Sequence, residues 1–230
     1  MLSAHSCLPC EGHLEAACQI FKHIKSHLNL AAVSDSELPH IDRKNFKPVD
    51  WTSIHGDVKE SRPCKMLPPR GKPAKISMFV DTTHAGDLIN RRSQTGVMTF
   101  VNSAPVTQHG KRQGTMEASA FRLECAALCI GMLEMKKGMQ CKLQMMGAPI
   151  WDPSNAFCNN QSVACNSTPP QSQLKKKHLS VCHHCICECC TKQGTQMSFE
   201  LTETNVANLC TKVSSADRRR KLCKGQWDVG

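Results

Sequence analysis

The sequence predicts a mixed α/β fold, in which helices pack against a sheet of parallel and antiparallel strands. Apolar and polar residues alternate over residues 76–81 and 197–202, which indicates strands because successive side chains face opposite sides of a sheet. Apolar residues recur every three or four positions over residues 116–137, which predicts a long helix with one buried side. The predicted order is three strands, helix, strand, helix, strand, helix, and this order suits a mixed sheet with helices against it.

Two segments precede the predicted sheet. Residues 12–28 are predicted to form an amphipathic helix, because their apolar residues recur at helical spacing. Residues 30–73 are predicted to be loop-like, because prolines recur throughout and interrupt any long element. The stretch Pro68–Pro73 is the expected domain boundary.

The first half of the sheet is predicted from three consecutive strands, at residues 76–81, 95–102 and 104–110, with Asn102 and Ser103 as turn residues between the last two. The helix over 116–137 follows. Glu124 lies one helical turn from two members of its apolar stripe, and so lies at the stripe itself. The stripe consists of Phe121, Cys125, Leu128, Met132 and Met135.

The second half contains a short buried strand at residues 156–158 and a helix over residues 175–191. The alternation at 197–202 then predicts a last strand with one side facing water. A final helix closes the predicted domain.

Several motifs occur in the order found in one known family. The run Phe79–Asp87 is Phe-Val-Asp-Thr-Thr-His-Ala-Gly-Asp, and Arg91–Val97 follows as Arg-Arg-Ser-Gln-Thr-Gly-Val. This run resembles the opening of the ribonuclease H domain that closes the polyprotein of copia-type retrotransposons. Colinear matches cover most of the chain and together are stronger evidence than any one short motif. They lie at Ala104–Val106, Lys111–Gln113, Glu117–Glu124, Phe157–Val163, Leu174–His178 and Thr204–Lys212.

The resemblance implies a division of the chain. Residues 1–30 resemble the end of the helix that connects the reverse transcriptase to this domain, and residues 31–73 form a proline-rich linker. Residues 74–213 are expected to form a ribonuclease-H-like mixed five-stranded sheet flanked by helices, with the N-terminal helix as an extension. Residues 214–230 are expected to be a basic tail. The family activity is Mg2+-dependent cleavage of RNA in RNA–DNA hybrids during reverse transcription.

The resemblance also assigns the catalytic positions. Asp81 matches the first family acid and Glu124 the second, and these two would hold Mg2+ if any activity remains. Asn159 and Asn208 stand where the family carries its third and fourth acids. An amide is neutral and offers one carbonyl oxygen, whereas a carboxylate offers two anionic oxygens. We therefore expect a catalytically impaired or inactive site.

The charge of the chain indicates a polyanionic partner. Its formal net charge is +10, from 29 Lys and Arg against 19 Asp and Glu. We expect weak binding to an RNA–DNA hybrid or another nucleic acid, and the original partner would be the reverse transcriptase part of the same polyprotein. The basic residues expected to meet phosphates, although a solvated helix start explains them equally well, are Lys175, Lys176, Lys177 and His178.

Cysteines support a different hypothesis, a zinc-stabilised Cys/His-rich module that binds nucleic acid. Cys182 and Cys185 have the two-residue spacing of a zinc knuckle, as do Cys7 and Cys10. Against it, the later pair falls on a predicted helix without a Gly or Pro to shape a knuckle turn, so we do not expect native zinc.

A third hypothesis is that the chain is an unselected fragment of a decayed element with no activity. The absence of tyrosine and the 16 cysteines fit sequence drift. No signal peptide or membrane-spanning run is predicted, so we expect a reducing compartment, the cytoplasm or the nucleus, in which the 16 cysteines are mostly free thiols.

Overall fold

The computed structural model describes most of the sheet and its helices. The described residues are 8–26, 31–32, 36–38, 41, 46, 49–52, 56, 66–84, 91–114, 119–151, 153–167, 180–192, 194–223 and 227–228. The predicted basic segment Lys175–His178 lies outside them, as does Cys7.

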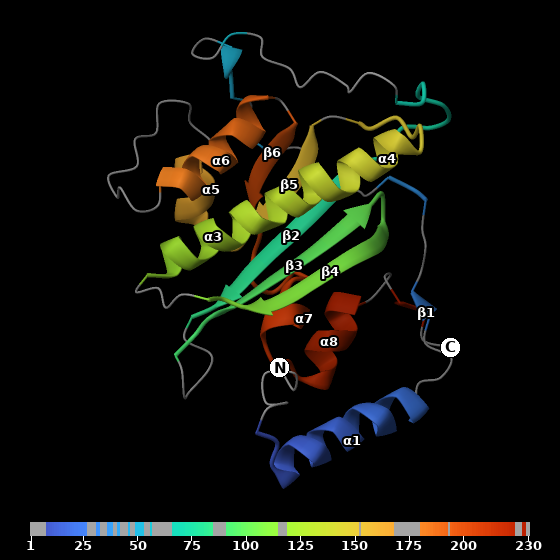
Figure 1. The fold of residues 1–230 in the computed structure, drawn as a ribbon, viewed down its shortest axis with the longest axis vertical. Helices are drawn as coiled ribbons and strands as arrows, with labels where there is room; N and C mark the ends of the chain where they lie inside the picture. Colours follow the sequence, from blue (N-terminus) through green and yellow to red (C-terminus); the bar gives the residue numbers. More distant parts are fainter. Residues whose placement is uncertain are drawn as a thin grey trace.

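A mixed five-stranded sheet forms the centre of the molecule, with strand order β4-β3-β2-β5-β6 (Figure 1). β2, β3 and β4 are antiparallel neighbours, whereas β5 runs parallel to β2 and β6 runs parallel to β5. The predicted fold class, a mixed five-stranded sheet flanked by helices, is therefore confirmed. The strands are β2 (Ile76–Thr83), β3 (Gln94–Val101), β4 (Ala104–Arg112), β5 (Ser154–Cys158) and β6 (Thr195–Phe199).

Helices cover both faces of this sheet (Figure 1). On one face lie α3 (Ala120–Leu133), α5 (Gln161–Ser167) and α6 (Ser180–Thr191), and α3 continues through a π-helical segment, η3 (Glu134–Gln140), into α4 (Cys141–Met145). On the other face lie α7 (Asn208–Thr211) and α8 (Ala216–Cys223).

Each face has its own apolar core, because side chains of β2 alternate between the two. Val80 packs in the larger core with Leu128 and Met132 of α3. Phe79 packs against the smaller core on the α7 and α8 side, which includes Phe100. Complete burial of side chains of this size stabilises the fold by about 1.5–3 kcal/mol each.

Local signals explain where several elements begin and turn. Ser119 caps α3, since its side chain accepts a hydrogen bond from the backbone N–H of Arg122. Asn102 occupies the predicted turn between β3 and β4 with φ of 56°, a region that asparagine tolerates better than most residues. Its Oδ1 also accepts the N–H of Lys75 at 2.8 Å, which ties the turn to the start of β2.

The last strand differs from its prediction. β6 spans Thr195–Phe199 rather than residues 197–202, and Met197 and Ser198 are both buried although they face opposite ways. The predicted water-facing side is therefore wrong for Ser198. A small hydroxyl can be buried when it is hydrogen-bonded, and that of Ser198 donates to the carbonyl of Phe199 at 3.3 Å.

The segments that flank the predicted domain differ in how far their apolar side chains are buried. The N-terminal extension is helical as predicted, α1 (Glu11–Ser26), and its apolar residues such as Leu14 and Phe21 are exposed. Trp51, in the expected linker, is buried and belongs to the larger core. Leu222 of α8, in the expected basic tail, belongs to the smaller core. The domain boundaries remain a prediction, but both neighbouring segments contribute side chains to the folded domain.

The observed helices differ from the predicted ones in their bounds and in number. The predicted helix over 116–137 begins at Ala120 within the described residues and changes to π-helical geometry at Glu134. Only the part of the predicted helix 175–191 from Ser180 onward is described. The short helix α5 and the basic helix α8 were not predicted, because neither has an extended apolar stripe.

Candidate active site at the end of the sheet

Asp81 is the centre of the candidate site. It lies in β2 with no exposed surface, and the alternation along the strand directs it to the face that α7 covers. Asn159 Nδ2 donates to its Oδ1 at 2.5 Å, and Lys212 Nζ donates to the same oxygen at 3.0 Å. The hydroxyl of Thr211 donates to its Oδ2. Both carboxylate oxygens are therefore already hydrogen-bonded by groups of this chain.

The parallel pairing of β2 with β5 brings Asn159 to Asp81. Val80 and Cys158 are paired across these strands, so the next residue in each strand direction, Asp81 and Asn159, lies at the same level. Adjacent parallel strands place residues at equivalent positions side by side, at the same end of the sheet. The amide at the third family position is consequently in direct contact with the first family acid.

Asn208 reaches Asp81 through Lys212. Its Nδ2 donates to the carbonyl oxygens of Thr202 and Asn205, at 2.6 and 2.9 Å. Its Oδ1 accepts from Lys212 Nζ at 2.8 Å. The two residues are four apart, the spacing at which helical side chains meet. The amide of Asn208 is fully buried and uses its two N–H donors to hold the local backbone.

Two residues hold α7 close to the sheet. Gly96 is the partner of Asp81 in β3, and a Cβ at this position would lie 2.6 Å from the Thr211 methyl and 2.9 Å from the Ala207 carbonyl. Asn205, fully buried, donates from Nδ2 to the Val80 carbonyl at 2.8 Å. The absent side chain of Gly96 and this anchor allow Thr211 to reach Asp81.

Glu124 approaches the same end of the sheet from the other face. It extends from α3, is 5% exposed, and its Oε1 accepts the hydroxyl of Thr82 at 2.7 Å. Its Oε2 is buried without a hydrogen-bond partner in the part of the chain that the structure describes. The pKa of this carboxyl is raised from 4.5 to about 7, chiefly by burial; the Thr82 hydroxyl lowers it and the nearby Asp81 charge raises it.

The structure thus brings together Asp81, Asn159, Asn208 and Glu124, although only Asn159 contacts Asp81 directly. Their catalytic role remains a prediction. Sequence reasoning missed Lys212 and Thr211, which are the other direct partners of Asp81. A signal was present, because both residues stand in the Thr204–Lys212 motif and Lys212 follows Asn208 by four positions.

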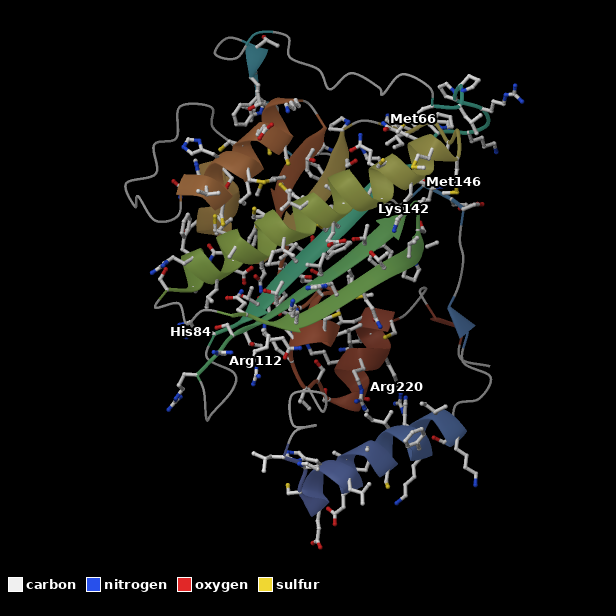
Figure 2. The ribbon with its side chains drawn as sticks, in the orientation of Figure 1. Met66, His84, Arg112, Lys142, Met146 and Arg220 are labelled. Atoms are coloured by element: carbon white, nitrogen blue, oxygen red, sulfur yellow. The ribbon has the colours of Figure 1, made fainter. Side chains whose placement is uncertain are left out.

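A cluster of basic side chains lies at the same end of the sheet. Register places Thr83, Gln94 and Arg112 in one row across β2, β3 and β4. Figure 2 shows His84, just beyond the end of β2, and Arg112 at the same end of the sheet. The basic edge, as we name this group, consists of His84, Arg91, Arg92, Lys111 and Arg112.

The residues at this site do not fit a pair of magnesium ions. Mg2+ prefers carboxylate oxygens, but both oxygens of Asp81 accept hydrogen bonds and Asn208 Oδ1 accepts one from Lys212. Glu124 offers one oxygen without a partner. Among the described residues, no group of three or more His, Cys, Asp or Glu side chains is arranged to hold a metal ion.

The thiols of α6 face a second set of thiols on α3. Cys125 and Cys129 of α3 interact with Cys182 and Cys185 of α6, and all four are free. The pKa of Cys125 is raised to about 12, chiefly by burial and in smaller part by the neighbouring thiols. Cys125 and Cys129 belong to the larger apolar core, and Cys182 and Cys185 pack against it, so these thiols form part of the apolar contact between α3 and α6.

Comparisons with known proteins give matches among solved structures alone, because no protein-family model and no curated protein matches the chain. The N-terminal RNase H domain of a Mycobacterium tuberculosis protein is similar with a TM-score of 0.45 and 11% identity, over 66% of this chain and 97% of that chain. RNase H1 from Halobacterium salinarum is similar with a TM-score of 0.41 and 14% identity, over 57% of this chain and 89% of that chain.

One similar structure is a longer protein. A foamy viral protease–reverse transcriptase in complex with an RNA/DNA hybrid matches with a TM-score of 0.40 and 18% identity, over 80% of this chain but 24% of that chain. This chain therefore spans about a quarter of that viral protein.

A separate test concerned membranes. Within the described segments, every helix is too short or too polar to cross a bilayer.

Proposed function

We propose that this chain is a ribonuclease-H-like domain of copia-type retrotransposon origin that binds nucleic acid, with an RNA–DNA hybrid as its ligand, and does not cleave it at a useful rate. The observation that carries the proposal is the state of Asp81, which is saturated by Asn159, Thr211 and Lys212 at the position where the family gathers negative charge. The colinear motifs support the family origin.

Phosphodiester cleavage of this kind needs an activated water and stabilisation of charge on the attacking and leaving oxygens. Two Mg2+ ions supply both in two-metal sites, and they need several anionic ligands to hold their +4 charge. This site offers the carboxylates of Asp81 and Glu124, and Lys212 offsets one of those charges. The net charge is too small to hold two divalent ions.

Binding of a hybrid places fewer chemical demands on the site than its cleavage does. The basic edge lies at the same end of the sheet as Asp81, and Arg92 and Lys111 are exposed within it. An A-like duplex is recognised through its backbone and 2′-hydroxyl groups, so binding is expected to be independent of sequence. Neutralisation of phosphates releases counterions, so affinity falls steeply with salt. Lys175–His178 remain further candidates for phosphate contacts.

Free thiols such as Cys125 suit a reducing compartment, the cytoplasm or the nucleus.

The test combines two assays on the whole chain. Fluorescence anisotropy with a labelled hybrid measures binding, and a gel assay with Mg2+ or Mn2+ measures cleavage of the RNA strand. We expect salt-sensitive binding without cleavage, weakened by Arg92→Ala and Lys111→Ala. Lys142→Ala, on α4 at the far end of the sheet, is the matched control (Figure 2).

Two results would contradict the proposal. Metal-dependent cleavage that Asp81→Asn abolishes would show an active enzyme. Binding that is equally weak for hybrid and for an unrelated polyanion, and unchanged in the basic-edge variants, would favour a fragment without a nucleic-acid function.

A further inference from the structure

Lys212 places a cation within the acidic site. Its Nζ lies 3.0 Å from Asp81 Oδ1 and 2.8 Å from Asn208 Oδ1, so it joins the first and fourth family positions. Asp81 has no exposed surface, whereas the Lys212 side chain keeps 36% of its surface exposed. A partly exposed lysine therefore pairs with a fully buried carboxylate.

The donor count leaves the ammonium one N–H without an acceptor among the described residues. An ammonium carries three N–H donors and no acceptor. Asp81 and Asn208 take two of them. Because the Lys212 side chain is partly exposed, a phosphate oxygen could accept the third.

The contacts of Asp81 support Lys212 as a fixed part of the site. The carboxylate is buried, and among the described residues its hydrogen-bond donors are Asn159, Thr211 and Lys212, of which Lys212 alone carries a charge. A buried carboxylate is stable only when paired and hydrogen-bonded. A divalent ion bound to the same Oδ1 would lie a few ångströms from the ammonium and be repelled by it.

We propose that Lys212 is the resident cation of this site: it takes the place of a divalent ion beside Asp81 and contacts a phosphodiester oxygen of the bound nucleic acid. This inference rests on the proposed function, because the phosphate is that of the hybrid. It predicts that the hybrid binds without a divalent cation, and that removal of Lys212 creates a divalent-cation site at Asp81.

The first experiment follows thermal unfolding in MgCl2 and in EDTA. The wild-type chain is expected to show the same Tm in both. Lys212→Met is expected to be less stable in EDTA and to gain several degrees with Mg2+, because an ion that binds only the folded state stabilises it. Lys212→Met combined with Asp81→Asn removes both charges and is expected to lose the response to Mg2+. Lys142→Met is the control for loss of a lysine elsewhere.

The second experiment measures hybrid affinity by anisotropy under the same conditions. The wild-type affinity is expected to be equal in Mg2+ and EDTA within about twofold. In EDTA, Lys212→Met is expected to bind about 5–10-fold more weakly, with a salt slope smaller by about one, since one phosphate contact is lost. Mg2+ is expected to restore part of the affinity of this variant alone.

The outcomes separate the two proposals. A wild-type Tm that rises with Mg2+ and loses this rise in Asp81→Asn overturns the resident-cation proposal, and this comparison decides the matter even if Lys212→Met does not fold. Hybrid binding by the wild type that requires Mg2+ overturns it equally. A wild-type chain that ignores both Mg2+ and the hybrid refutes the proposed function, and the phosphate contact with it, while leaving Lys212 as the counterion of Asp81.

Discussion

Replacement of Glu124 by glutamine tests the electrostatics of the site from the α3 side. The carboxyl is almost fully buried, and burial raises its pKa from 4.5 to about 7. Well below pH 4.5 the group is protonated in both the folded and the unfolded chain, so its ionisation does not change the free energy of unfolding. Between 4.5 and 7 the folded chain keeps a proton that the unfolded chain releases, so the free energy of unfolding falls as pH rises.

The magnitude follows from the two pKa values. A shift of 2.5 units, the difference between 7 and 4.5, corresponds to about 3 kcal/mol of lost stability once the group is ionised in both states. Glutamine resembles the protonated carboxyl, since its Oε1 can still accept the hydroxyl of Thr82 and neither residue has a partner for its second polar atom. Glu124→Gln should therefore match the wild type near pH 4 and be more stable by about 3 kcal/mol near pH 8.

Urea unfolding followed by circular dichroism at constant ionic strength, repeated from pH 4 to pH 8, measures this difference. Other titrating groups are common to both proteins, so they cancel from the difference between the curves. Glu203→Gln removes one carboxylate from an exposed position and controls for net charge. Parallel stability curves for wild type and Glu124→Gln, or a variant that is less stable at pH 8, would refute the argument that Glu124 is buried with a raised pKa.

Three further substitutions test how α7 is held at the site. Gly96→Ala should destabilise the fold by about 1–3 kcal/mol by forcing α7 away from β3, whereas alanine at its strand partner Gly110, where a Cβ would have its nearest neighbour at 3.5 Å, should be neutral or slightly stabilising in the same urea titration. Asn205→Ala should cost about 2–4 kcal/mol, because it leaves the buried carbonyl of Val80 without its donor; a cost below about 1 kcal/mol would show that this anchor is unimportant. Asn208→Asp should also destabilise the chain, since the carbonyls that its amide serves lose their donors; a more stable variant in thermal unfolding would contradict this.

The predicted effect of Asn208→Asp differs from an expectation drawn from the sequence alone. The family match implies that aspartate at positions 159 and 208 would restore Mg2+ ligands. In the structure, however, the amide of Asn208 holds two backbone carbonyls, and Lys212 already neutralises Asp81. Restoration of the acids without removal of Lys212 is therefore expected to give little gain in Mg2+ affinity.

Most of the fold could be predicted from the periodicity of the apolar residues in the sequence. The strands at β2, β3 and β4 and the helix α3 lie within a few residues of their predicted bounds, because alternation and helical spacing are local properties of the chain. Elements with weak local signals were missed. Helix α8 is strongly polar, and its buried apolar side chain, Leu222, lies in a core cluster that includes Met98 and Phe100, more than a hundred residues earlier in the chain.

The sequence by itself predicted the mixed sheet, the position of Asp81 in its first strand, and amides at two positions where the resemblance implies acids. Only the tertiary structure decided what surrounds Asp81. Asn159 reaches it through parallel strand pairing, and Thr211 and Lys212 reach it because Gly96 lets α7 approach. These contacts join residues that are 78 to 131 positions apart, and no local pattern specifies them, because they depend on strand register and helix packing rather than on the spacing of neighbours.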